Sequence, residues 1–575
     1  MGFDDLDPDE PPPEGLDYPL LRQCADEPQN DIGNSRRLRH RKGDGLIHVQ
    51  NIGWHAYDGK RWKEDVDGAA TRPVCHEVVA AIALERFVID PTEREAADIA
   101  AAEDAAVVVR ALKRELATLS KRGAGDGSKA RKAEISDELR ELDQATERGA
   151  LAKKAIAGRK AQRGRFANAS GNKGKLDGML AEALPYLSRA VGDLDADPLA
   201  LNVGNGTLRI LQREIEDLEC PDPDVRRTKL AWVAELRDHD RTDMMSKLAD
   251  VDFDPDAQAP MFLKMLERIL PSEAVRDYVQ RYLGYSITGL TREQCFCVFH
   301  GEGRNGKSTL VDIVARILAE YSTSLPIDSL LNNGGNKKGS EATPDLARLP
   351  GARFVRTAEP KEGAAFDESL IKGLTSSEPI PVRRLNQEFN DIYPTFKLAG
   401  SVNRKPPVKG NDDGIWRRIN LVPFEVQIPP EEVDKQLGDK LWTERAGILN
   451  WLVAGCLDYL TRGKLDPPLE VSAATQEYRD DSDVMALFAR GALDITRNAD
   501  DSVEVGKLYR SFEVFCRRNA VTTFAQATFT RRLPATAKQL GFEKGKASVS
   551  VYVGIRIRPE FEPRFNGPGF PDGGD

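Results

Sequence analysis

The sequence predicts an α/β protein built around a phosphate-binding loop, and three neighbouring features predict it. Residues 301–308 read G-E-G-R-N-G-K-S, which fits the pattern G-x-x-x-x-G-K-[ST]. The short apolar run from Gln294 to Phe299 before the loop is typical of a buried strand. Between Lys307 and Tyr321 apolar residues recur at helical spacing, so a helix with one buried face follows. A strand, a glycine-rich loop and a helix in this order argue against a chance match.

The loop predicts binding of ATP with Mg²⁺. Glycines allow successive backbone N–H groups to turn toward phosphate oxygens, and the helix N-terminus adds a favourable dipole. Lys307 is expected to reach the β- and γ-phosphates, while the Ser308 hydroxyl contacts Mg²⁺. The predicted ATP-binding residues are Gly301, Gly303, Asn305, Gly306, Lys307, Ser308 and Thr309.

Length and composition narrow the class of protein. The 575 residues have room for three or four domains. No apolar run approaches the ~20 residues of a membrane span, and no signal peptide opens the sequence. The seven cysteines show neither the even framework of a secreted domain nor a C-x-x-C metal pair. We therefore expect a cytoplasmic protein with no membrane partner.

The net charge of −10 comes from the two ends of the chain. Residues 1–31 hold ten acidic residues against one arginine, and residues 559–575 hold four against one. The rest carries a charge near +2, so the overall acidity does not exclude a nucleic-acid partner. Basic clusters at 36–42 and 153–175 fit either a solvated linker or a binding surface.

The first 290 residues are expected to hold a tail and two domains. Residues 1–45 are predicted to form a disordered tail, acidic and then basic. Residues 46–195 begin with a small mixed segment and continue as Ala- and charge-rich helices over 92–190, either a helical hairpin or a coiled coil. Residues 196–290 are predicted to form a mostly helical domain.

The remaining residues are expected to hold the nucleotide-binding core and one further domain. The core occupies residues 291–465 and ends in a helical lid at about 430–463. Residues 483–560 combine two or three short helices with a β-prone end, and residues 561–575 form a flexible tail.

Three motifs follow the loop. The strand from Arg353 to Glu359 ends in a carboxylate that could hold the Mg²⁺ shell or polarise a water. The strand from Lys397 to Asn403 ends in an amide that could position that water, with an Asx turn as the alternative. The segment 414–424 contains Arg417-Arg418, either surface residues or a cation that reaches a neighbouring subunit.

The order and spacing of these motifs, within about 120 residues, resemble the core of superfamily 3 helicases. These are AAA+-like ring motors of small DNA viruses, phages and plasmids. The sequence is most similar to the C-terminal part of phage/plasmid primase-helicases, the group that includes the poxvirus enzyme. The resemblance covers residues 195–560 and, more loosely, 46–90. The further motifs that carry it are Asn305 before Gly-Lys-Ser, Ile371–Thr375, Pro394–Lys397, Trp416–Arg418, Asn202–Leu208, Asp252–Pro255 and Leu283–Gly289.

The resemblance assigns roles to five residues. It makes Lys307 a phosphate ligand, Glu359 the catalytic acid that also serves Mg²⁺ together with Ser308, and Asn403 the sensor. Arg417 or Arg418 would act on ATP of the neighbouring copy, which implies a homo-oligomeric ring, expected to be a hexamer. Many relatives carry two adjacent acids at the Glu359 strand, whereas here the neighbour is Ala358.

The resemblance also implies two DNA contacts. A β-hairpin between Glu378 and Phe396 would place Arg383 and Arg384 on DNA phosphates, with an ordinary charged hairpin as the alternative. The last domain looks like a winged helix, whose recognition-type helix Gln526–Leu540 carries Arg531, Arg532 and Lys538. A winged helix that docks on protein is the alternative.

The expected function is that of an ATP-driven DNA helicase of phage or plasmid replication, in a bacterial host's cytoplasm, which translocates on single-stranded DNA at a replication fork. Residues 1–195 show neither the carboxylates nor the zinc ribbon of a primase, so a separate primase or polymerase is the expected partner. The alternative is a nucleotide-switched DNA-binding initiator without processive unwinding. A P-loop kinase fits less well, because no acceptor-site signature is present.

Overall fold

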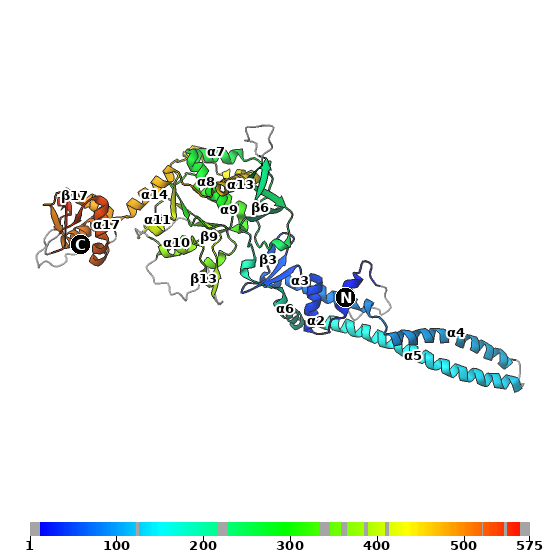
Figure 1. Ribbon diagram of the computed structural model, residues 1–575. Coiled ribbons are helices and arrows are strands. Elements are labelled where there is room, and N and C mark those ends of the chain that lie inside the picture. Colours follow the sequence, from blue (N-terminus) through cyan, green and yellow to red (C-terminus); the bar gives the residue numbers. More distant parts are fainter. Residues whose placement is uncertain are drawn as a thin grey trace. The chain divides into compact units, whose positions relative to one another are not determined.

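The computed structural model describes residues 12–121, 126–216, 228–332, 345–357, 365–383, 389–408, 413–519, 521, 523–545 and 549–563. The chain forms two compact units, Met1–Ala196 and Asp197–Asp575, which contain the elements labelled in Figure 1.

The first unit opens with two helices, so the prediction of disorder over residues 1–45 is wrong for the part that the structure describes. The helices are α1 (Tyr18–Ala25) and α2 (Asp31–Lys42). Arg37 of α2 is fully buried, and its Nε donates to Glu85 Oε1 at 2.8 Å. Arg163 donates to the same carboxylate. Composition suggested a tail because these contacts are distant in sequence. Glu85 lies 48 residues from Arg37 and 78 residues from Arg163.

Several charges of the basic cluster at 36–42 have partners within this unit. Arg36 pairs with Glu27 at 3.2 Å, Lys42 pairs with Glu77 at 2.8 Å, and the Arg39 guanidinium lies 4.0 Å from the Tyr186 ring centroid. This cluster therefore belongs to the folded helix α2, although the side chains of Arg36 and Lys42 remain half exposed.

A small sheet and two helices complete the core of the first unit. The sheet has the order β3-β2-β1-β4, and β1 pairs antiparallel to β2. Its strands are β1 (Leu46–Val49), β2 (Gly53–Tyr57), β3 (Trp62–Glu64) and β4 (Ser188–Arg189). Apolar side chains of α3 (Thr71–Leu84) and α6 (Lys173–Leu187) form the core with Leu46.

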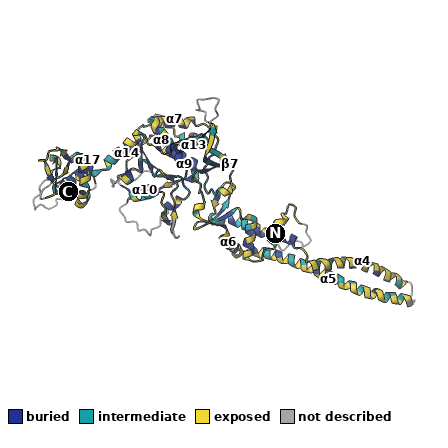
Figure 2. Cartoon of the chain, viewed as in Figure 1, coloured by how far each residue is buried: buried dark blue, intermediate teal, exposed yellow. Residues whose placement is uncertain are grey.

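A helical hairpin extends from this core. Its arms are α4 (Glu93–Lys121) and α5 (Asp126–Ser170), and most of their surface is exposed (Figure 2). Arg131 pairs with Glu115 at 3.0 Å and Arg159 with Glu95 at 2.7 Å, so the arms run antiparallel. Of the two predicted alternatives, a helical hairpin and a coiled coil, the hairpin is the one that the structure shows for residues 93–121 and 126–170.

The second unit begins with a β-meander, so the mostly helical prediction for 196–290 is wrong in its first half. The strands β5 (Ala200–Val203), β6 (Gly206–Glu216) and β7 (Thr228–Arg237) form an antiparallel sheet. A two-residue turn, Gly204-Asn205, joins β5 to β6. This dipeptide between apolar runs was the available signal for a hairpin. Helices α7 (Pro260–Ile269) and α8 (Glu273–Tyr285) follow.

A five-stranded parallel sheet forms the centre of the second unit. Its order is β16-β8-β15-β11-β9, with β8 (Phe296–His300) between β16 and β15. Its other strands are β9 (Ser322–Leu325), β11 (Phe354–Thr357), β15 (Lys397–Val402) and β16 (Ile419–Pro423). Alternate residues of β8 enter two different cores, Cys297 and Phe299 one, Phe296 and Val298 the other. Both faces of the sheet are therefore covered, as its continuous apolar sequence predicts.

Helices hold this sheet in place. The crossover helix α9 (Lys307–Leu318) joins β8 to β9, and α8 packs with α13 (Arg445–Arg462) in one core. The hydroxyl of Tyr282 on α8 donates to the Leu398 carbonyl and accepts from the Cys297 N–H at 3.3 Å. One side chain of α8 thereby links the starts of β8 and β15.

A hairpin and several helices follow in this unit. The hairpin strands are β13 (Ile380–Arg383) and β14 (Phe389–Ile392), which lie within the predicted range from Glu378 to Phe396. The predicted lid region contains α12 (Leu437–Thr443) and α13, and α14 (Leu469–Ser482) follows.

The last part of the chain has its own apolar core. Its helices are α15 (Val484–Ala492), α16 (Val505–Arg518) and α17 (Gln526–Leu540). Strand β17 (Leu493–Ile495) pairs with β21 (Ile555–Ile557), and a second sheet has the order β18 (Ser502–Glu504), β20 (Val551–Val553), β19 (Glu543–Lys544). Phe488 meets Phe512 edge-on at 5.5 Å between the ring centroids. Across the described residues of the chain, no helix is both long and apolar enough to span a membrane.

Candidate nucleotide-binding site

The glycine-rich loop lies at the carboxyl end of β8, where ligands bind in open parallel sheets. Gly306 caps α9 with φ +76°, a backbone conformation that favours glycine. A Cβ on Gly306 would lie 2.6 Å from Ile269 Cγ2, so the end of α7 supports the loop from beneath. Glycine at position 306 is thus favoured by both the turn and its packing.

Lys307 is the buried centre of the site. Its side chain is only 4% exposed, and its ammonium has three oxygen acceptors. They are the Gly301 carbonyl at 2.6 Å, Asn305 Oδ1 at 3.0 Å and Asn403 Oδ1 at 3.0 Å. Asn305 is itself fixed, because its Nδ2 donates to the Phe424 carbonyl at 3.4 Å. The three acceptors hold the ammonium at the base of the loop, where an anion could replace one of them.

A cavity of about 280 Å³ opens beside this ammonium. Side chains from α9 and from the carboxyl ends of three neighbouring strands line it: Lys307, Ser308, Val311, Asp312, Ser324, Arg356, Thr357, Ser401 and Asn403. Parallel strands end at the same edge of the sheet, which explains how residues 308 and 403 meet.

Two hydroxyls at this cavity have buried, unsatisfied oxygens. Thr357 Oγ1 and Ser401 Oγ have no hydrogen-bond partner within the part of the chain that the structure describes. Gly400 pairs with Thr357 on the neighbouring strand. A Cβ on Gly400 would lie 3.2 Å from Thr357 Oγ1, so glycine leaves room for that hydroxyl. Buried polar atoms normally have partners, so these two fit a polar ligand in the cavity.

These hydroxyls and the Asp312–Arg356 ion pair were missed from the sequence. The available signal for Ser401 was its spacing from Asn403, since alternate residues of a strand share a face. Nothing comparable marks Asp312 or Arg356, which meet only because α9 packs against β11.

His300 precedes the loop, and its pKa is lowered by burial and by the charges of Lys405 and Lys307. Neutral imidazole at this position adds no further charge beside the ammonium. The folded site therefore disfavours a further positive charge beside Lys307.

The predicted arginine pair divides between two environments. Arg418 is 8% exposed and donates to Thr375 Oγ1 at 3.1 Å, the Gly414 carbonyl at 2.6 Å and Gln294 Oε1 at 3.4 Å. Arg417 is exposed. The Arg418 side chain therefore fixes the residues just before β16 by hydrogen bonds within its own chain. Arg417 is available to another molecule.

The other predicted site residues do not all lie at the cavity beside Lys307. Gly301, Gly303 and Asn305 lie in the loop, and Thr309 follows Ser308 in α9 without lining the cavity. Arg383 belongs to β13, while Glu359 and Arg384 lie outside the described residues. Arg531 and Lys538 are exposed on α17, whereas the Arg532 guanidinium lies 5.2 Å from the Phe524 ring centroid.

Comparison with known proteins relates the chain to viral replication proteins. Residues 35–271 match the family described as D5 N terminal like. A protein named "Putative helicase" from Acanthamoeba polyphaga mimivirus is 28% identical over 271 residues, which are 44% of this chain and 28% of the relative. A "Putative helicase" of Frog virus 3 is 23% identical over 316 residues, 52% of this chain and 32% of the relative.

Other matches carry a different name or none that bears on function. A "Putative primase" of African swine fever virus is 24% identical over 230 residues, 39% of this chain and 22% of the relative. The apo structure of the NrS-1 C terminal region matches with a TM-score of 0.34 and 14% identity, over 53% of this chain and 78% of that one.

The chain thus aligns with about a third or less of the length of these curated relatives, 22–32%. The curated relatives are named as putative helicases or primases, and all of them come from viruses. These matches relate the chain to the D5-like primase-helicases of large DNA viruses.

Proposed function

We propose that this chain is an ATP-driven motor of the superfamily 3, AAA+-like type, which forms a ring and unwinds DNA. One observation carries the proposal. The ammonium of Lys307 and the amide of Asn403 meet at 3.0 Å beside a cavity with two unsatisfied hydroxyls. An ammonium, an amide and hydroxyls around one space suit the phosphates of a nucleotide and an attacking water.

The residues present fit ATP with Mg²⁺. When bound, ATP supplies the phosphoanhydride bond and Mg²⁺ offsets charge on its phosphates. Lys307 would exchange the Asn403 oxygen for phosphate oxygens, which frees the amide to orient a water. Ser308, exposed at the cavity, would take Mg²⁺, and the Thr357 and Ser401 hydroxyls would gain partners. Glu359 is the proposed base and second Mg²⁺ residue.

The exposed arginine supports the proposed ring. A group that neutralises transition-state charge must reach the γ-phosphate, and Arg418 is already held by three acceptors within its own chain. Arg417 is exposed and is the proposed finger toward the neighbouring copy's ATP. The hairpin of β13 and β14 supplies the proposed DNA contacts through Arg383 and Arg384.

The experiment measures ATP hydrolysis by the full chain with and without single-stranded DNA, and strand displacement on a forked duplex. We expect DNA to raise turnover several-fold and Lys307→Ala to abolish both activities. Lys264→Ala, which removes an exposed lysine of α7, is the matched control and should leave both intact. Negligible turnover together with ATP-dependent DNA binding would replace the motor by the nucleotide-switched initiator.

A further inference from the structure

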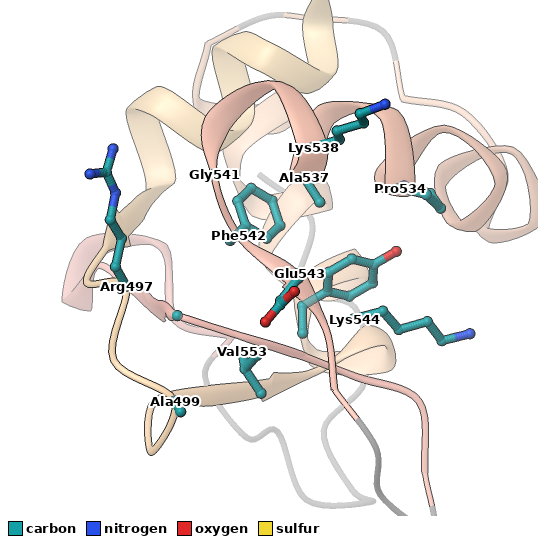
Figure 3. Close-up of a pocket in the computed structure, with 12 residues that line it drawn as sticks. Arg497, Ala499, Pro534, Ala537, Lys538, Gly541, Phe542, Glu543, Lys544 and Val553 are labelled. Carbon is teal, nitrogen blue, oxygen red and sulfur yellow. The ribbon is translucent and has the colours of Figure 1, made fainter.

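The C-terminal domain contains a second hollow that the proposed motor does not use. It has a volume of about 560 Å³ and lies between the second half of α17 and the strands β19 and β20 (Figure 3). Its polar rim includes Arg497, Lys538 and Lys544, and its walls include Phe542 and Tyr552.

The charge of this domain is opposite to that of the whole chain. Residues 484–558 hold thirteen basic and six acidic residues, whereas the whole chain carries −10. Outside the hollow, Arg556 pairs with Asp501 at 2.7 Å and Arg558 pairs with Asp494 at 2.9 Å. The three rim cations have no ion-pair partner among the residues that the structure describes. The Glu543 carboxylate also lines the hollow, so three cations and one anion leave the lining with a net positive charge.

The rim cations come from separate segments. Lys538 projects from α17, Lys544 lies on β19, and the Arg497 guanidinium extends beside Gly541, 3.9 Å from where a Cβ would stand. Figure 3 shows Arg497 on one side of Phe542, with Lys538 and Lys544 on the other. A ligand in the hollow would thus meet cations on two sides. A nucleic-acid strand that enters on one side and leaves on the other would meet both.

The interior is apolar and aromatic. The rings of Phe542 and Tyr552 meet edge-on with centroids 5.8 Å apart, and each residue is 3% exposed. Pro534, Ala537 and Val553 add aliphatic surface. Both rings are almost wholly buried, so the open apolar surface comes from Pro534 and Val553 above them. Cations at the rim and this apolar surface match the two halves of a nucleotide, a phosphate and a base.

A fourth cation extends this track along α17. Arg531 stands seven residues before Lys538, which is about two helical turns and places both side chains on one face. Arg531 is exposed and has no ion-pair partner in the described part of this domain. A nucleic-acid strand that leaves the hollow past Lys538 would meet Arg531 next.

We propose that this hollow holds one unstacked nucleotide of a single nucleic-acid strand. The rim cations take the flanking phosphates, and the walls around Phe542 take the base. A duplex keeps its bases paired and stacked, so it offers nothing to fill the apolar interior. An acidic peptide satisfies the rim but leaves the same interior empty. The site does not depend on ATP hydrolysis, so Lys307→Ala should retain it.

The test uses the full chain without nucleotide and measures the affinity for a labelled single-stranded oligonucleotide and for its duplex across a salt series. The variant Arg497→Gln/Lys538→Gln/Lys544→Gln removes the rim. The control Arg490→Gln/Arg510→Gln/Arg517→Gln removes three exposed cations of the same domain that do not line the hollow. We expect the rim variant to bind the single strand at least about tenfold more weakly. The slope of log affinity against log salt should fall by about 0.7 for each phosphate that the variant no longer neutralises.

A second measurement locates the base. Photocrosslinking of wild type with an oligonucleotide that carries one 5-iodouracil should join the base to a peptide that contains Phe542 or Tyr552. Ala499→Glu, at an exposed position of the lining, should reduce this crosslink. The crosslink decides the outcome in wild type even where a variant fails to fold.

Three results would overturn the proposal: equal weakening in both triple variants, equal binding of the duplex, or a crosslink outside residues 497–554. Competition by a synthetic peptide of residues 1–17 that displaces the base crosslink would instead assign the hollow to the chain's own acidic segment.

Discussion

The ammonium nitrogen of Lys307 lies 3.0 Å from the side-chain oxygen of Asn403, although 96 residues separate them in the chain. The two residues follow neighbouring parallel strands, β8 and β15, whose carboxyl ends share one edge of the sheet. This hydrogen bond therefore depends on the register in which β8 and β15 pair. Any nucleotide that engages Lys307 must also alter the environment of Asn403.

The first prediction concerns this contact. Asn403→Asp places a carboxylate beside Lys307 and should hold the ammonium in an ion pair, so ATP should bind more weakly. Asn403→Ala removes the amide that positions the water and should lower turnover by about 10²-fold with little change in ATP affinity. Turnover and nucleotide affinity, measured separately, distinguish the two variants. Equal effects on both quantities in both variants would contradict the assigned role.

The second prediction separates the paired arginines. Arg417→Ala should lower ATP turnover by about 10³-fold with an unchanged melting temperature, because Arg417 is exposed. Mixing with Lys307→Ala should restore part of the activity if the arginine acts on a neighbouring copy. Arg418→Ala removes hydrogen bonds to Thr375, Gly414 and Gln294 and should destabilise the fold by about 2–4 kcal/mol. A stable Arg418→Ala protein that is rescued by mixing would reverse the assignment.

The third prediction concerns the buried carboxylate of the first unit. Glu85 is completely buried between Arg37 and Arg163. Glu85→Gln keeps its volume but leaves two buried guanidinium groups without a counter-charge, and should cost about 3–5 kcal/mol of unfolding free energy. Urea unfolding measures the change, and protease sensitivity of residues 12–45 should rise with it. Glu77→Gln, which removes an exposed partner of Lys42, is the control and should cost less than about 1 kcal/mol.

The fourth prediction concerns acid sensitivity at the loop. Burial and the charges of Lys405 and Lys307 lower the pKa of His300 below its usual 6.5. The unfolded chain therefore binds this proton more readily than the folded chain. The contribution to unfolding free energy is constant above about pH 6.5 and is lost as the pH falls toward the folded pKa.

Thermal unfolding between pH 7.5 and pH 5.5 tests this prediction. His300→Gln should flatten the decline of melting temperature below about pH 6.5. His76→Gln, at an exposed histidine of α3, should leave the profile unchanged. Parallel profiles for wild type and His300→Gln would show that another group controls the acid sensitivity.

The elements around the loop could be read from the sequence because their signals are local. The apolar run at 294–299 lies within two residues of β8, and the helical pattern from Lys307 lies on α9. The β-meander after residue 200 was missed because its strands alternate weakly, with exposed and half-buried residues in β7. The helices α1 and α2 were missed because their stability depends on Glu85 and Arg163, beyond the reach of local composition.

The candidate site also contains residues that local sequence signals predict and residues that only long-range contacts bring together. The glycines, Lys307 and Ser308 are adjacent in the chain, and their spacing alone is enough to predict the chemistry of the loop. Thr357 and Ser401 became candidates only through the burial of their unsatisfied hydroxyls. Arg417 and Arg418 have the same residue type and adjacent positions, so only their different burial could separate them.

The sequence by itself determined the glycine-rich loop, its flanking strand and helix, and the order of the motifs that follow. These depend on steric and hydrogen-bonding needs of residues that are neighbours in the chain. The tertiary structure alone decided that Asn403 faces Lys307, that Arg418 is committed within its own chain, and that three cations surround the hollow in the C-terminal domain. Each of these depends on strand order, helix packing or burial, which join residues tens of positions apart and leave no periodic trace in the sequence.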